Sequence, residues 1–135
     1  MLTENDIIEI LANHLNKDDG WEIKNKLTTI QKGVDILAEK NGVTLYVEAK
    51  GETSSKKSSR RYGKQFTKNQ VGTHVSVAIL TSLKVLSKND NKSKKVAMAF
   101  PDNKNHRDII ELIAPALRRA GIVTYLVKEN SVIEM

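Results

Sequence analysis

The chain has 135 residues, with 22 Lys or Arg against 16 Asp or Glu, so that its formal net charge at neutral pH is +6. This length suits a single hydrophobic core, and we expect residues 1–135 to form one domain. Cysteine is absent, which excludes disulfides, thiolate metal sites and cysteine nucleophiles, while an acidic start and the lack of an apolar run of roughly 20 residues favour a cytoplasmic protein without a membrane span.

The first predicted element is a helix that begins near Thr3 and ends before Asp18. Thr3 is followed three residues later by an acid, which is a helix-capping signal. Apolar residues then recur at helical spacing, namely Ile7, Ile8, Leu11 and Leu15. A short strand from Trp21 to about Leu27 is expected next, because apolar residues occupy alternate positions at its start.

Residues 33–50 carry the strongest local signal, a predicted β-hairpin. Two β-prone runs flank Asn41-Gly42, which is the preferred type I′ turn. Cross-strand partners then have numbers that sum to 83, so that Asp35 faces Glu48 and Gly33 faces Lys50. The same register places an apolar set on the opposite face, with the pairs Val34/Ala49, Ile36/Val47 and Ala38/Leu45.

Four further elements are expected after the hairpin. A helix from about Phe66 to Leu86 presents one apolar face made of Val71, Val75, Ala78, Ile79, Leu83 and Leu86. Residues 96–100 form a short apolar run that is typical of a strand buried on both faces. A helix at about 104–120 and a strand at 122–127 follow, which gives the order αβββαβαβ and predicts a mixed sheet flanked by helices.

Two carboxylates facing each other across a hairpin repel, and a divalent cation would offset that cost. Asp35 and Glu48 are therefore candidate ligands of Mg²⁺, with Mn²⁺ as a substitute, and Lys50 points to the same face. Such a group suits phosphodiester hydrolysis, in which Lys50 either helps to deprotonate the attacking water or stabilises developing negative charge. The alternative is an ordinary surface ion cluster, but the apolar neighbours of Asp35 and Glu48 favour a site.

Asp35, twelve intervening residues and then Glu48-Ala49-Lys50 resemble the motif of the PD-(D/E)xK nuclease superfamily, which includes Holliday-junction resolvases and Mrr-like restriction enzymes. The resemblance covers about residues 3–100. It implies a restriction-endonuclease-like αβββαβ core of the α/β class, with a mixed central sheet flanked by helices and a C-terminal αβ addition. Val34 stands where the family name has proline.

Members of that superfamily often add a glutamate from the first helix. Glu4 is the better match as a third metal ligand, because helical rotation puts it on the apolar stripe of the first helix, whereas Glu9 faces away from that stripe. The alternative for Glu4 is an acid favoured by the helix dipole. Related nucleases also carry a glutamine at the start of the next helix, for which Gln65 and Gln70 are the candidates. His14 and His74 are left out, because lone histidines are more often packed or exposed than catalytic.

The segment from Lys56 to Lys68, KKSSRRYGKQFTK, carries six cations and no acid. Such a patch is a plausible contact for DNA phosphates, the alternative being a solvated loop. Because the segment closely follows Lys50, we expect it to grip DNA beside the metal. The predicted DNA-binding residues are Lys56, Lys57, Arg60, Arg61, Tyr62, Lys64, Gln65 and Lys68, with Tyr62 as a stacking residue.

These patterns predict a divalent-metal-dependent DNA endonuclease of the junction-resolving, restriction or repair type. The alternative is a catalytically inactive nucleic-acid-binding module on the same fold. A homodimer is expected, because cleavage of both strands commonly uses two equivalent sites.

Overall fold

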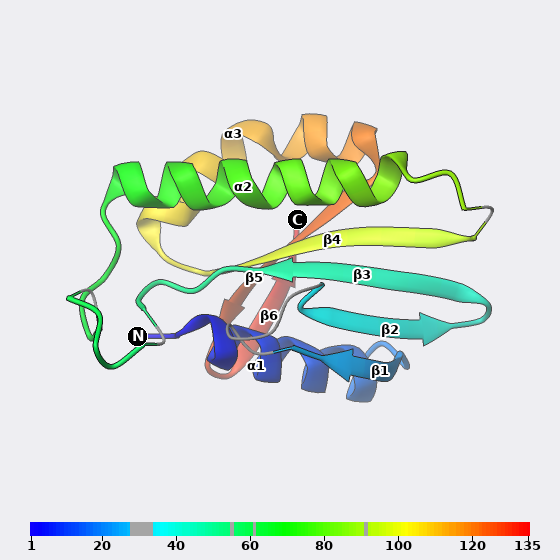
Figure 1. Ribbon diagram of the computed structural model, residues 1–135, viewed down its shortest axis with the longest axis horizontal. Helices are drawn as coiled ribbons and strands as arrows, with labels where there is room; N and C mark the ends of the chain where they lie inside the picture. Colours follow the sequence, from blue (N-terminus) through cyan, green and yellow to red (C-terminus); the bar gives the residue numbers. More distant parts are fainter. Residues whose placement is uncertain (28–33, 55, 61, 91) are drawn as a thin grey trace.

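The computed structural model describes residues 1–27, 34–54, 56–60, 62–90 and 92–135. A six-stranded sheet in the order β1-β2-β3-β4-β5-β6 carries α1 on one face and α2 and α3 on the other (Figure 1). The elements are α1 (Glu4–Lys17), β1 (Glu22–Lys26), β2 (Ile36–Lys40), β3 (Val43–Ala49), α2 (Lys68–Ser87), β4 (Lys94–Pro101), α3 (Lys104–Ala120), β5 (Ile122–Lys128) and β6 (Ser131–Glu134). Within those described ranges, no helix has the length and apolar character needed to cross a membrane.

The sheet is mixed, which confirms the expected α/β class. Strands β3, β4 and β5 run parallel, whereas β1, β2 and β3 form an antiparallel meander and β6 pairs antiparallel with β5. The carboxyl ends of β3, β4 and β5 therefore share one edge of the sheet. The start of the chain reaches the same edge, because Thr3 forms an isolated parallel bridge with Thr53.

Helix α1 packs its apolar stripe on one face of the sheet. The predicted cap is confirmed, since the Thr3 side chain and the Asp6 side chain each accept a hydrogen bond from the other residue's backbone N–H. The stripe is buried against the inward residues of the hairpin, and together they include Ile7, Ile8, Leu11, Leu15, Ile36, Ala38, Leu45, Val47 and Ala49. This core fixes α1 across the strands that carry the predicted site.

Helices α2 and α3 cover the opposite face, where one predicted core residue is wrong. The buried side chains of α2 are Val71, Val75, Ala78 and Ser82, whereas Leu83 is exposed. The buried residues of α2 continue from Ala78 to Ser82, a step of four residues. Leu83 lies about 100° from Ser82 around the helix axis and so points to solvent. The buried side of α2 therefore includes Ser82 and excludes Leu83.

The hairpin turn and most of its register are confirmed. Asn41 and Gly42 have φ values of 51° and 79°, as a type I′ turn requires, and the pairs from Ile36↔Val47 to Lys40↔Val43 follow the predicted numbering. Asn41 is also the only non-glycine residue with positive φ in the described part of the chain.

The register changes at Asp35, which is a correction to the prediction. The Asp35 backbone N–H donates to the Val47 carbonyl at 3.0 Å, although Val47 already pairs with Ile36. Two residues therefore oppose one, which is a β-bulge. Val34 consequently lines a small cavity beside Glu48 under α2 and does not pair with Ala49. Gly33, the predicted partner of Lys50, lies outside the described residues.

Strand β6 was not predicted, and the C-terminal addition is therefore αββ. Its four residues pair antiparallel with the end of β5. A strand of four residues at a sheet edge is too short to show a clear alternation, and the turn at Glu129 and Asn130 lacks glycine and proline.

Candidate active site

The candidate site lies at the carboxyl end of β3. Glu48 belongs to β3 and Lys50 follows it, Asp35 precedes β2, and Glu4 is the first residue of α1. A backbone crossing brings α1 to this place: a Cβ atom on Gly51 would lie 2.4 Å from the Glu4 nitrogen and 2.6 Å from the Thr3 carbonyl carbon. Only glycine allows so close an approach, and the crossing sets Glu4 beside the end of β3.

A cavity of about 320 Å³ opens at this point. Glu4 at the start of α1 and Lys50 after β3 line this cavity. Phe66 and His74 line it from the side of α2. The remaining lining residues come from the segment after β3, namely Gly51, Thr53, Ser54 and Lys56. The cavity is thus shared by the start of α1, the end of β3 and the beginning of the basic segment.

Asp35 is held at the site through the bulge. Asp35 is only 7% exposed, and its Oδ2 atom accepts a hydrogen bond from the Ala49 backbone N–H at 2.7 Å. Burial raises the pKa of the Asp35 carboxyl, while the Ala49 hydrogen bond and the charge of Lys50 act in the opposite direction. The Ala49 amide therefore orients this carboxylate toward the end of β3.

Glu48 and Lys50 are neighbours on one face of the strand end. Both side chains are largely buried, and Lys50 Nζ lies 3.4 Å from Glu48 Oε1. Burial and then the nearby charge of Asp35 raise the pKa of Glu48, and Lys50 partly counteracts them. Lys50 is therefore the cation that faces this pair of acids.

Glu4 completes the cluster and has the strongest perturbation. Its pKa is raised from 4.5 to about 7, first by burial and then by Asp35, with a smaller contribution from Glu48 and an opposing one from Lys50. The three carboxylates thus share one electrostatic environment, in which the Lys50 ammonium acts on all three acids. Clusters of this kind are found at functional sites more often than elsewhere.

The donor set of the cluster fits a hard divalent cation. Carboxylate oxygens are the ligands that Mg²⁺ prefers, and acids whose charged forms are disfavoured by burial and by each other gain from a cation. Among the described residues, no three His, Asp or Glu side chains already stand at metal-binding distances. Instead, the Ala49 amide holds Asp35 and Lys50 holds Glu48.

The two candidate glutamines have other contacts. Gln70 Oε1 accepts from the Thr67 backbone N–H at 2.8 Å, which makes Gln70 part of the capping box of α2. Gln65 Nε2 lies 3.5 Å from Glu52 Oε2. The structure therefore gives Gln70 a helix-capping role and does not bring either amide into contact with the carboxylate cluster.

The basic segment adjoins the cavity. Lys56 lines it, and the other described cations of the segment are exposed, namely Lys57, Arg60, Lys64 and Lys68, as is Tyr62. Lys68 Nζ also lies 3.9 Å from Asp108 Oδ2. Arg61 lies outside the described residues.

His74 is a site residue that the sequence reasoning left out. Its ring packs edge-on against Phe66 with centroids 4.5 Å apart, and its Nδ1 atom is buried without a hydrogen-bond partner in the described part of the chain. Burial lowers the pKa of His74, and Lys50 lowers it further. The sequence did offer one indication of this role, because His74 lies one helical turn after the candidate Gln70 near the start of α2.

Glu52 was also missed, and it ties together the segments around the cavity. Its Oε1 accepts from the Leu2 backbone N–H at 2.7 Å, and its Oε2 accepts from Asn103 Nδ2 at 2.8 Å. The Glu52 backbone N–H donates to the Leu2 carbonyl at 2.9 Å. Glu52 thus anchors the residues just before α1 and thereby the position of Glu4.

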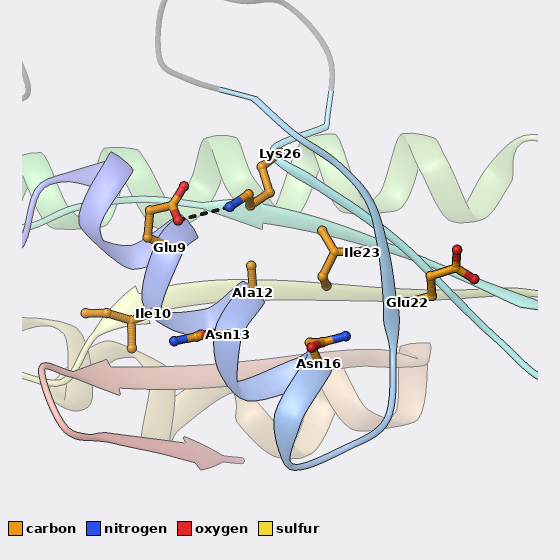
Figure 2. Close-up of a pocket in the computed structure, with 8 residues that line it drawn as sticks. All are labelled: Glu9, Ile10, Ala12, Asn13, Asn16, Glu22, Ile23 and Lys26. Atoms are coloured by element: carbon orange, nitrogen blue, oxygen red, sulfur yellow. Dashed lines mark hydrogen bonds and ion pairs between the residues drawn. The ribbon is translucent and has the colours of Figure 1, made fainter.

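A larger cavity of about 560 Å³ lies elsewhere, between α1 and β1 (Figure 2). Figure 2 shows Glu9 of α1 joined to Lys26 at the end of β1, with 3.0 Å between Oε2 and Nζ. Glu9 therefore lines a different cavity from the one that Glu4 lines.

Comparison of the chain with known protein families, curated proteins and solved structures finds no match. The functional interpretation therefore depends on the geometry and chemistry of the site itself.

Proposed function

We propose that this chain is a divalent-metal-dependent DNA endonuclease that uses Mg²⁺, with Mn²⁺ as a substitute. The observation that carries the proposal is the convergence of Glu4, Asp35, Glu48 and Lys50 at the carboxyl end of β3. Ligand sites in open α/β sheets commonly lie outside the carboxyl ends of parallel strands.

The fold, we propose, is of the restriction-endonuclease-like type. Support comes from the order αβββαβ over α1 to β4, with an antiparallel meander followed by a strand parallel to β3. Asp35 lies just before β2, and Glu48 lies near the end of β3. The last helix and the last two strands extend this core.

In this proposal the carboxylates of Asp35, Glu48 and Glu4 hold the metal. When bound, Mg²⁺ supplies positive charge to a phosphate oxygen and acidifies a bound water. The Ala49 amide orients the Asp35 carboxylate before a ligand arrives, and Glu52 anchors the backbone just before Glu4. Such preorganisation is what phosphoryl-transfer sites require.

Lys50 supplies the fixed positive charge of the site. Its Nζ stands beside Glu48 and borders the cavity, where it can donate hydrogen bonds to a phosphate oxygen that gains negative charge. The alternative role, removal of a proton from the attacking water, is tested by Lys50→Arg, which keeps the charge but does not lose a proton.

DNA reaches the cavity along the basic segment. The exposed cations from Lys56 to Lys68 would neutralise phosphates on either side of the scissile one, which gives salt-dependent and largely sequence-independent affinity. Tyr62, which is 45% exposed, is available for stacking on a base or sugar.

The decisive experiment is cleavage of plasmid, linear, flapped and four-way DNA with Mg²⁺, Mn²⁺ or Ca²⁺. The wild-type chain should cleave with Mg²⁺ or Mn²⁺, whereas Asp35→Asn should bind DNA without cleaving it. Glu9→Gln, a change in an exposed acid of the same helix as Glu4, is the matched control and should cleave normally. A wild-type chain that binds DNA but cleaves none of these substrates is the result that the inactive binding module predicts.

A further inference from the structure

We propose that His74 binds a DNA phosphate in the cavity at the end of β3, through an Nε2–H group that donates a hydrogen bond to a phosphate oxygen. The inference rests on the proposed function, because it takes a phosphodiester as the occupant of that cavity. His74 lines the cavity from α2, while Glu4, Lys50 and Lys56 line it from other segments. In the described part of the chain, no other residue of α2 belongs to the lining.

The two ring nitrogens of His74 are in different environments. Nδ1 is buried and has no hydrogen-bond partner among the described residues. Nε2 has no partner within those residues either, but it is not buried. Because His74 lines the cavity, Nε2 is the ring nitrogen that a ligand in the cavity can reach. Polar side-chain atoms in folded proteins are usually paired, so an unpaired and accessible nitrogen at a cavity wall is available to a ligand.

The single proton of the neutral His74 ring is on Nε2. Burial lowers the pKa of His74, and the charge of Lys50 lowers it further, so that the ring is neutral near pH 7 and carries one N–H group. A buried N–H group without an acceptor is less common in proteins than a buried acceptor without a donor. The buried Nδ1 therefore holds the lone pair, and Nε2–H presents a donor to the cavity.

Packing holds the His74 ring in this orientation. The rings of Phe66 and His74 meet edge-on, with an interplanar angle of 81° and centroids 4.5 Å apart. Phe66 is itself fixed, because its backbone N–H donates to the Glu52 carbonyl at 2.8 Å. The donor is thus oriented before a ligand arrives, which lowers the entropic cost of binding.

The charges of the cavity wall favour a phosphate as the occupant. Lys50 and Lys56 are the cations of the lining, and Glu4 is its acid within the described ranges, so that the cations outnumber the acid. Phosphate oxygens accept hydrogen bonds from ammonium groups and from neutral N–H groups, and bonds to a charged acceptor are the stronger kind. Lys50 follows β3 and His74 belongs to α2, so the two donors come from different segments.

The other two histidines of the chain are internal controls. His14 Nδ1 lies 2.9 Å from Asp18 Oδ2 at the far end of α1. His106 is fully buried, and its Nδ1 lies 2.8 Å from Asn103 Oδ1. Neither residue lines the cavity that His74 lines.

The first test is an NMR titration of the full chain, labelled with ¹⁵N in its histidine rings, with a short DNA duplex in Ca²⁺. The chain has three histidines, so single substitutions assign their ring resonances. The Nε2 resonance of His74 should shift and reach a plateau as DNA is added, whereas the ring resonances of His14 should stay in place. An Nε2 resonance of His74 that does not move at the highest DNA concentration overturns the proposal.

This titration separates the inference from the proposed function, because it requires no cleavage. A chain that cleaves no DNA with Mg²⁺ but whose His74 resonance shifts would contradict the nuclease and support the phosphate contact. A chain that cleaves DNA while His74 stays unperturbed would do the reverse.

The second test compares two variants by single-turnover cleavage. His74→Phe keeps an aromatic ring against Phe66 but removes the donor, and it should lower the rate by about 100-fold. His74→Gln keeps a side-chain N–H and should stay within about 10-fold of the wild type. His14→Gln is the control and should cleave normally. A His74→Phe variant with the wild-type rate overturns the proposal, as does a His74→Gln variant as slow as His74→Phe, because that result indicates proton transfer by the ring.

Discussion

Glu4 and Glu9 are acids of the same helix that lie in two different regions of the molecule. Glu4 is half-buried at the end of β3, close to two other carboxylates, and its pKa is raised to about 7. Glu9 is exposed in the groove between α1 and β1 and pairs with Lys26. The groove holds the larger cavity, yet Glu4, the acid with the raised pKa, lines the smaller one. Burial among like charges, and not cavity size, therefore marks the candidate site.

The first prediction concerns the lysine beside each group of acids. Lys50 lies beside Glu48 in the acid cluster and Lys26 pairs with Glu9, so the two lysines should differ in function. Lys50→Ala should reduce the Mg²⁺-dependent cleavage rate by about 1,000-fold, because it removes the ammonium that, in the proposed function, stabilises the reacting phosphate. Lys26→Ala should leave the rate unchanged. Single-turnover nicking of plasmid DNA measures both, and a Lys50→Ala variant that cleaves like Lys26→Ala would remove Lys50 from the site.

The next effect concerns DNA affinity. Combined replacement of Lys57, Arg60 and Lys64 by Ala should weaken DNA binding in Ca²⁺ by about 100-fold at moderate salt and reduce the slope of log affinity against log salt by about 2 to 3. Lys17→Ala, at the exposed end of α1, is the control. A salt slope equal to that of the control would exclude the basic segment from the DNA contact.

The third prediction uses the raised pKa of Glu4. The folded state keeps the Glu4 proton up to about pH 7 whereas the unfolded chain loses it near 4.5, so the stabilising contribution is complete below 4.5 and is lost as the pH rises through 7. Glu4→Gln should therefore raise the free energy of unfolding at pH 8 by about 1–2 kcal/mol and change it little at pH 4.5. Urea unfolding at both pH values measures this.

Glu9→Gln is the matched variant for that measurement. Removal of an exposed ion pair should change stability by less than about 0.5 kcal/mol at either pH. If Glu9→Gln and Glu4→Gln behave alike, the electrostatic contrast between the two ends of α1 is wrong.

The smallest effect is metal binding without DNA. At pH 8, Mg²⁺ at about ten times its dissociation constant should stabilise the wild-type chain by about 1.4 kcal/mol, which a thermal melt detects as a rise in Tm. Glu48→Gln should abolish the rise, and Glu9→Gln should retain it. An equal rise in both variants would place the metal elsewhere.

Much of the fold could be predicted because local signals and tertiary structure agree. The Thr3 cap, the Asn41-Gly42 turn and the buried run of β4 each depend on residues that are neighbours in the sequence, and all three are confirmed. Because the Asn41-Gly42 turn sets the register of the hairpin, it also predicted that Asp35 and Glu48 lie near each other.

The details of the site depend on contacts that a sequence pattern does not encode. The bulge at Asp35 arises where its side chain takes the Ala49 amide and so competes with the regular backbone ladder. His74 reaches the cavity only because of the way in which α2 lies across β3 and β4, and Glu52 acts through the distant Leu2 and Asn103. Alternation and spacing carry no information about such long-range contacts.

The crossing at Gly51 has a consequence for how the site comes into being. Glu4 and Lys50 are far apart in the sequence, and the backbone contact at Gly51 is where their segments touch. An unfolded or partly folded chain therefore has no assembled acid cluster, and loosening the start of α1 would dismantle it while the hairpin stays intact. Any ligand that requires all of these acids would select the fully folded molecule and protect its first helix from opening.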